Sequence, residues 1–496
     1  MIMMDTEVLV VTGLAIAATA LWLRWKFSGQ PSGMNIPGNN GQWPFIGDTM
    51  RLLNPRTMAS YQVSCRKRWN SPVCRTSVLF KKCVFVSGND NIKKFASEEM
   101  SKKNTQACFP PHHQALFGKH SILVTSGGEH DKVRKVITPL LQPNLFKKEI
   151  DMAAAAFVED CLISCKQNPD EYIPLVPKFK QFTLRAVLRI VMGDERWEEW
   201  SETNTNKMMI LLEDYAIWSK GLLSVPTANI PFTPAYRAMS ARGRIKCVLM
   251  EVIKEERKAL ELENRQSVGA SSLNNGVKSS LIRRLLKEGE KHSFITDDLI
   301  VDNVFTFLFA GTDTTASILT SSFYELAKNP TVLNRLQSCV NSEVQGTEHK
   351  SDDVLLAFIS EVQRFYPAAP FTMREIIREG INMGDELGTI PPGYLATYSI
   401  AGTLLDDETT YPRPREFDLD RWLAQIKPPV CAFGGGNRIC PGRFLANAES
   451  LALLRLVLSK EHGFDWKLKE DQNLEFLYTP GHFPVDGLLA KVRYWK

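Results

Sequence analysis

Apolar residues recur at helical spacing along most of this chain, and they alternate as in a strand over only a few short segments. Amphipathic stretches with apolar positions three and four residues apart predict long helices over residues 178–193, 205–220 and 236–262. Residues 72–88 alternate and are rich in Val and Phe, which predicts a hairpin, and further strands are expected within 386–400 and 474–492. This pattern indicates an α+β fold that is mostly α-helical with a small β portion.

One helix is predicted over Thr296 to Lys328, and both of its ends are marked. Thr296 suits the N-cap and acidic residues follow it in the first turn, where they complement the helix dipole. Pro330 cannot continue a helix, so the helix should end just before it.

The middle of this helix reads Ala310-Gly311-Thr312-Asp313-Thr314. The small residues Ala310 and Gly311 would let a bulky planar ligand lie close to the helix. A Thr hydroxyl can bond to a carbonyl one turn earlier and distort the helix locally. Asp313 and Thr314 would then form an acid–alcohol pair able to deliver protons. A simple Gly-Thr kink in a buried helix is the alternative interpretation.

The N-terminus contains an uncharged apolar run from Val8 to Leu23, followed by Arg24 and Lys26. We expect a retained membrane anchor over residues 1–27, one N-terminal transmembrane helix, with the positive flank and the rest of the chain in the cytosol. A cleaved signal peptide is the alternative, but no basic residue precedes the apolar run. A proline- and glycine-rich hinge over 28–48 should connect the anchor to a catalytic domain over 49–496.

Composition narrows the function classes further. The chain has 496 residues, of which 44% are hydrophobic and 23% charged, which is typical of a globular protein. Its net charge of +5 is too small and too dispersed to indicate nucleic-acid binding. The ten cysteines form no Cys-x-x-Cys pair and no zinc-type spacing, so free thiols in a reducing compartment are expected.

Residues 433–442 (FGGGNRICPG) hold the most informative cysteine. A metal-binding thiolate needs backbone N–H groups that point at the sulfur, which glycines permit, and a positive potential, which a helix N-terminus supplies. Cys440 has both, because an apolar helical run is predicted from Phe444 to about Leu458. Arg438 is placed to pair with an anionic group on the same ligand.

The spacing of Phe433, Gly436, Arg438, Cys440 and Gly442 resembles the haem-binding signature of the cytochrome P-450 family, without a mismatch. The resemblance covers roughly residues 37–496 and implies the cytochrome P-450 fold. It implies Cys440 as the proximal iron ligand of a haem b, an iron protoporphyrin IX. Thiolate ligation favours cleavage of the O–O bond.

Further positions follow from the same resemblance. Glu361, Arg364 and Arg421 match the family's structural Glu–Arg–Arg network, which we assign to a buried brace of the haem-side core. The residues expected to bind the haem carboxylates are His130, Arg134, Arg374 and Arg438. For His130 and Arg134, four residues apart, a solvated helix face is the alternative.

The lining of the substrate pocket also comes from the resemblance. The segments expected to form it are 109–122, 305–314, 368–373 and 479–483. Phe305, Phe309, Phe371 and Met373 make this lining apolar, which suits a lipophilic substrate; ordinary core packing of each aromatic ring is the alternative. Residues 229–242 look like the corresponding part of sterol- and terpenoid-hydroxylating members.

The resemblance thus implies a membrane-bound monooxygenase of the endoplasmic reticulum, inserting one oxygen atom of O2 into a terpenoid or steroid in specialised metabolism. Electrons would come from NADPH through a separate NADPH–cytochrome P-450 reductase, docking near Arg443 and Lys427. Two alternatives stay open: a haem-thiolate isomerase or dehydratase that does not use O2, and a non-catalytic haem- or sterol-binding protein. The Asp313–Thr314 pair argues against both.

Overall fold

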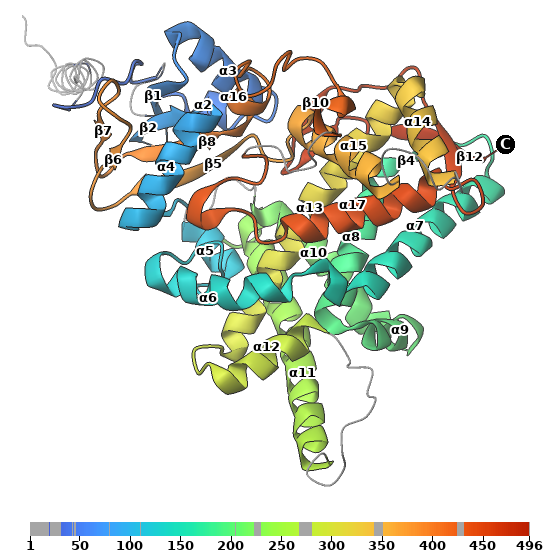
Figure 1. The fold of residues 1–496 in the computed structure, drawn as a ribbon. Coiled ribbons are helices and arrows are strands. Elements are labelled where there is room, and N and C mark those ends of the chain that lie inside the picture. Colours follow the sequence, from blue (N-terminus) through green and yellow to red (C-terminus); the bar gives the residue numbers. More distant parts are fainter. Residues whose placement is uncertain are drawn as a thin grey trace, which may run out of the picture. The chain divides into compact units, whose positions relative to one another are not determined.

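The computed structural model describes residues 19, 31–41, 43, 46–78, 80–109, 111–203, 205–222, 230–266, 280–341, 351–423 and 431–495. The chain forms two compact units that alternate along the sequence (Figure 1). Unit 1 consists of Met1–Cys108, Pro370–Glu416 and Val430–Ile439, and unit 2 of Phe109–Ala369, Phe417–Pro429 and Cys440–Lys496. Both units contain residues of the predicted catalytic domain over 49–496.

A five-stranded sheet organises unit 1. Its strands, in spatial order, are β1 (Val73–Val78), β2 (Lys81–Val86), β8 (Leu395–Ser399), β5 (Phe371–Ile376) and β3 (Thr105–Ala107). β2 and β8 are parallel, and the other neighbours are antiparallel. β1 and β2 pair from Val73↔Val86 to Val78↔Lys81, which confirms the hairpin predicted over 72–88. β6 (Ile381–Asn382) and β7 (Thr389–Ile390) form a second small sheet.

Short helices complete unit 1. They are α2 (Thr49–Leu52), α3 (Met58–Trp69), α4 (Asn89–Lys102), α16 (Ile400–Leu404) and the 3₁₀ turn η3 (Gly436–Arg438). α4 packs against both β2 and η3, so the glycine-rich motif lies beside this helix.

Unit 2 is mostly helical. Its helices are α5 (Pro111–Phe117), α6 (Gly127–Leu140), α7 (Lys147–Gln167), α8 (Leu175–Met192), α9 (Asp194–Thr203), α10 (Thr205–Leu222), α11 (Pro234–Gln266), α12 (Leu281–Lys291), α13 (Asp297–Lys328), α14 (Pro330–Asn341), α15 (Ser351–Phe365) and α17 (Arg443–Leu458), with 3₁₀ turns η1 (Pro143–Leu145) and η2 (Leu419–Trp422). α8, α10 and α11 confirm the three long helices predicted from periodicity. Two small sheets join them: β4 (Ile173–Pro174), β12 (Leu489–Tyr494) and β9 (Phe464–Leu468), and the pair β10 (Phe476–Tyr478) and β11 (His482–Pro484).

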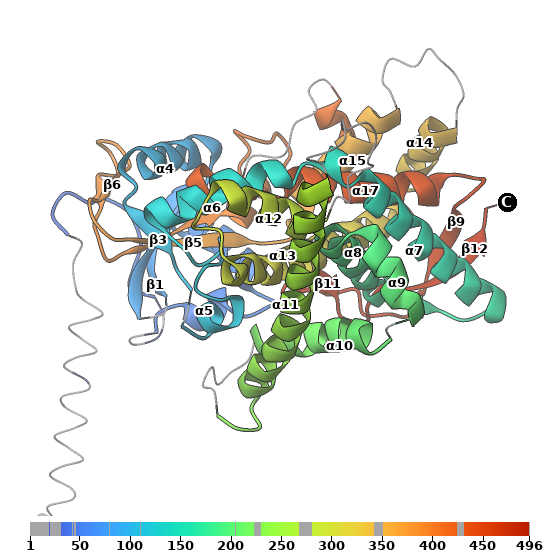
Figure 2. The same ribbon diagram turned by 90° about the horizontal axis from the view of Figure 1, so that it is seen from below.

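The long helix α13 begins and ends as predicted. The Thr296 hydroxyl accepts a hydrogen bond from the Leu299 N–H at 3.2 Å, and the helix ends at Lys328. α8 and α17 lie beside it (Figures 1 and 2). A core of buried residues from α8, α10, α11 and α13 fixes this central helix in unit 2.

The predicted anchor over 1–27 lies outside the described residues except for Thr19. In the part of the chain that the structure describes, no helix combines the length and the apolar character needed to cross a bilayer. The described part of the predicted hinge packs onto unit 1. Met34 and Ile36 are buried, and the Asn35 N–H donates to the Leu387 carbonyl at 3.0 Å.

Candidate functional site

Cys440 lies between the turn η3 and the start of α17, and positive groups surround its thiol. Burial raises the pKa of this thiol, while the Gly442 N–H and the guanidinium groups of Arg134 and Arg443 act in the opposite direction. Arg443 also donates from Nη1 to the Cys440 carbonyl at 3.2 Å. An N–H donor and two cations around a thiol favour the thiolate once a metal replaces the proton.

His130 and Arg134 both lie on α6, one helical turn apart. His130 is 2% exposed, so the solvated-face alternative is wrong for this residue. Burial lowers the pKa of Arg134, and the nearby Cys440 acts to raise it. Unit 2 therefore brings Arg134 and the cysteine into one electrostatic environment, as expected if both face the same ligand.

Asp313 and Thr314 lie in the middle of α13, but their side chains have different partners. The Thr314 hydroxyl donates to the Ala310 carbonyl at 2.5 Å, which is the bond predicted one turn back along the helix. The buried Asp313 carboxylate lies 2.6 Å from Nζ of Lys180 on α8. No sequence pattern indicated Lys180, because a lysine on an amphipathic helix usually faces solvent.

A strip along α13 remains uncovered although the helix is otherwise largely buried. Phe307, Ala310, Gly311 and Thr314 are half-buried or exposed, and their spacing of three, four and seven residues places them on one face. The first turns of α17, which contacts α13, are also only half-buried. Small residues on α13 and a thiol before α17 fit a planar apolar group that carries a metal at its centre. Haem is such a group.

The predicted site residues of unit 1 are Arg374, Phe433 and Arg438. Arg374 on β5 is 6% exposed, and its Nε donates to Oε1 of Glu99 at 3.0 Å. Phe433 and Arg438 are half-buried in the glycine-rich loop, where Gly434 and Gly436 adopt φ values of 76° and 61°. Only glycine adopts such values easily, which explains glycine at these two positions of the motif.

The predicted Glu–Arg–Arg network is present in unit 2, with Glu361 and Arg364 fully buried. The Glu361 carboxylate accepts from Arg364 Nε at 2.8 Å and Nη2 at 2.7 Å, and from Arg421 Nε at 3.4 Å. Two partners were not predicted: the Asp418 N–H and the Trp422 Nε1–H, each at 2.8 Å. The side chain thus fixes the segment around η2 to α15.

Aromatic side chains gather where α5, α10 and α13 meet in unit 2. Phe117 packs edge-on against Phe309 and Trp218, with centroids 5.3 and 5.7 Å apart, and Trp218 lies 5.1 Å from Phe305. Phe305 is fully buried and belongs to the core, whereas Phe309 is half-buried. Phe117 lies within the lining segment predicted over 109–122, whereas Trp218 was not predicted, because an aromatic residue at helical spacing is usually a core residue. Phe371 and Met373 pack instead against the core of unit 1.

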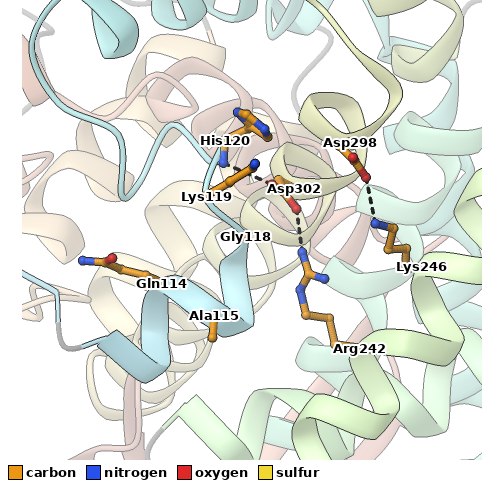
Figure 3. Close-up of a pocket in the computed structure, with 9 residues that line it drawn as sticks. All are labelled: Gln114, Ala115, Gly118, Lys119, His120, Arg242, Lys246, Asp298 and Asp302. Atoms are coloured by element: carbon orange, nitrogen blue, oxygen red, sulfur yellow. Dashed lines mark hydrogen bonds and ion pairs between the residues drawn. The ribbon is translucent and has the colours of Figure 1, made fainter.

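A cavity of about 390 Å³ in unit 2 has a charged lining (Figure 3). Arg242 and Lys246 of α11 pair there with Asp302 and Asp298 of α13, at 2.5 and 2.7 Å. Oδ2 of Asp302 also accepts from the His120 N–H at 3.1 Å. Such paired charges suit a polar surface better than the binding of a lipophilic molecule.

The comparisons with known proteins agree with this geometry. The family model described as "Cytochrome P450" matches residues 37–488. Abscisic acid 8'-hydroxylase 1 of Oryza sativa subsp. japonica is 24% identical over 469 residues, covering 92% of this chain and 90% of the relative. Beta-amyrin 28-monooxygenase of Vitis vinifera is 25% identical over 507 residues, with 98% of each covered. The solved structure of a retinoic acid-bound cyanobacterial CYP120A1 superimposes with a TM-score of 0.74 at 22% identity, covering 94% of this chain and all of that one.

Proposed function

Since the chain belongs to the cytochrome P-450 family and is an oxygen-incorporating oxidoreductase, we propose that it inserts one oxygen atom of O2 into a terpenoid or steroid substrate of specialised metabolism. Membership of this family implies a haem iron, electrons from a redox partner and a lipophilic substrate. The observation that supports the site most directly is the Cys440 thiol, with the Gly442 N–H and two arginines around it.

In this proposal Cys440 binds the iron of the haem. Bound through a thiolate, that haem supplies the oxygen-activating chemistry. His130, Arg134, Arg374 and Arg438 would bind its two carboxylates, and Phe433 of the glycine-rich loop would be a further haem-binding residue. Arginine side chains suit these carboxylates, because charge-assisted hydrogen bonds are stronger away from water.

In this proposal, proton transfer is the task of two side chains on α13. Asp313 holds a proton at its carboxyl group and Thr314 passes it on through its hydroxyl, which is the task predicted for them from the sequence. The contact with Nζ of Lys180 at 2.6 Å holds the Asp313 carboxyl group in place on α13. The bond from Thr314 to the Ala310 carbonyl orients the hydroxyl oxygen.

A terpenoid or steroid substrate is favoured by two observations. The relatives named above are hydroxylases or monooxygenases of abscisic acid and of beta-amyrin. In this chain, the half-buried Phe309 offers an aromatic surface on α13 beside Phe117. Apolar and aromatic linings select lipophilic substrates and use few hydrogen bonds.

We further propose that NADPH–cytochrome P-450 reductase supplies the electrons, and that residues 1–27 hold the protein in the endoplasmic reticulum membrane with its catalytic domain facing the cytosol. Arg443 is a candidate contact for the reductase, since it is close to Cys440. Lys427, the other predicted contact, lies outside the described residues.

The visible spectrum of the reduced protein with carbon monoxide tests the central claim. The wild-type protein should show the strongly red-shifted Soret band of a thiolate-ligated haem. Cys440→Ala should lose that band, because no other residue is proposed to bind the iron. Cys431→Ala is the matched control: Cys431 is a buried free thiol of the same segment and should be dispensable for the band. A Cys440→Ala protein that keeps the band would refute the assignment.

A further inference from the structure

Glu99 of α4 is a buried carboxylate in unit 1 that no sequence motif explains. The residue is 1% exposed and binds three side chains from three strands. Its Oε1 accepts from the Thr105 hydroxyl at 2.7 Å and from Arg374 Nε at 3.0 Å, and its Oε2 accepts from the Tyr398 hydroxyl at 3.1 Å. A buried charge is tolerated only with this degree of pairing.

These bonds fix one edge of the Arg374 guanidinium. Nε is bound to Glu99, and Nη1 donates to the Met373 carbonyl at 3.1 Å. The Tyr398 ring lies 5.7 Å from the guanidinium carbon. Among the described residues, Nη2 forms no hydrogen bond, and the side chain is 8% exposed. A guanidinium offers five N–H donors, so Arg374 keeps donors for an anion.

Glu99 also contacts the glycine-rich loop directly. A Cβ atom added at Gly436 would clash with Glu99 Oε2 and lie 3.1 Å from the Tyr398 hydroxyl oxygen. Helix α4 therefore packs against η3 through the same carboxylate that binds Arg374. One side chain thus determines the positions of two elements predicted to bind haem carboxylates, β5 and the loop that contains Arg438.

We propose that Glu99 is a positioning residue for the haem: it orients Arg374 toward a haem carboxylate and fixes the backbone of the glycine-rich loop at Gly436. This inference rests on the proposed function, because it requires a haem bound through Cys440. The negative charge of Glu99 lies beside the cation that binds the haem carboxylate. It therefore affects both haem retention and the haem reduction potential.

The test compares Glu99→Gln with Glu98→Gln in the purified holoprotein. Glu99→Gln keeps the size of the side chain and removes its charge. Glu98 is the adjacent residue on α4, and its carboxylate pairs with Lys102 and accepts from the Asn382 N–H instead. Three quantities are measured: the rate of ferric haem transfer to excess apomyoglobin, the haem reduction potential, and the midpoint of thermal unfolding.

Glu99→Gln should transfer haem about tenfold faster or more, which is the usual cost of losing a partner that orients a ligand. Its reduction potential should become more positive, because a negative charge is lost near the haem. Glu98→Gln should match the wild type in both. In an Arg374→Gln background, Glu99→Gln should have a smaller effect on haem transfer, because Glu99 orients the haem through that guanidinium.

A Glu99→Gln protein with wild-type haem transfer and potential would overturn the inference. So would a variant that only unfolds at a lower temperature, because that is a structural effect alone. Failure of the proposed function is distinguishable: the wild-type protein would then lack the thiolate-type carbon monoxide band before any variant is made.

Discussion

At the scale of single residues, burial shifts the pKa values of ionisable side chains, and Glu449 is an example. Glu449 on α17 is 1% exposed, and its Oε1 has no hydrogen-bond partner among the described residues. Burial raises the pKa of this carboxyl to about 8, and a hydrogen bond with Thr315 of α13 acts weakly in the opposite direction. The sequence did not indicate this residue, because a glutamate within a helix is usually exposed.

Glu449 should therefore make stability depend on pH. The folded state binds the proton up to about pH 8, while the unfolded chain releases it above its ordinary pKa of about 4.5. Stability falls as pH rises through this window, by about 1.4 kcal/mol per pH unit at most. We expect Glu449→Gln to flatten the dependence of the unfolding free energy on pH between 6 and 8, as measured by urea unfolding. Glu461→Gln, at an exposed position, should leave the slope unchanged; an unchanged slope in Glu449→Gln would contradict the prediction.

At the scale of elements, buried charge networks connect segments that hydrophobic packing alone would leave free to shift. Glu361 accepts five hydrogen bonds: two come from Arg364 within α15, and three come from the segment around η2 and join it to α15. The Glu361–Arg364 spacing was visible in the sequence, but the same spacing occurs in exposed pairs such as Lys467–Glu470. Only the fold places the first pair in a fully buried environment.

Glu361→Ala should lower the unfolding free energy by about 3–5 kcal/mol, because it leaves the buried Arg364 without a counter-charge. Glu470→Ala removes an exposed partner at the same i, i+3 spacing and should cost less than about 1 kcal/mol. Thermal or urea unfolding of both variants measures the difference. Equal losses in the two variants would show that the network is not the source of stability.

At the scale of the whole molecule, the proposed site residues come from both units. Cys440, His130, Arg134, Asp313 and Thr314 belong to unit 2, and Arg374, Phe433 and Arg438 to unit 1. The ten-residue motif itself is divided, because unit 1 ends a segment at Ile439 and unit 2 resumes at Cys440. Within each unit, the residues proposed for one ligand are held by different helices or strands.

The membrane anchor predicted over residues 1–27 concerns the location of the whole molecule. Deleting residues 1–27 should move the protein from a carbonate-resistant membrane fraction to the soluble fraction, because the apolar run Val8 to Leu23 is lost. A chain in which residues 8–23 are replaced by leucines is the control and should stay with the membrane. A truncated protein that remains in the carbonate-resistant fraction would contradict the anchor.

The sequence alone determined the features that are local. Hydrophobic periodicity placed α8, α10 and α11, and alternation placed the β1–β2 hairpin, since these patterns depend on which residues face a core. The capping of α13 by Thr296 was also readable, because a cap involves neighbours along the chain. The motif around Cys440 predicted a cysteine ligand for the same reason: its glycines, arginine and thiol are adjacent in sequence.

Only the tertiary structure decided which distant residues meet. Lys180 pairs with Asp313 across α8 and α13, and Glu99 binds Arg374 from a segment 275 positions earlier. Long-range pairs of this kind leave no periodic signal, since either partner alone resembles an ordinary surface charge. Burial then gives them their strength, because removal from water raises both the cost of an unpaired charge and the benefit of pairing it.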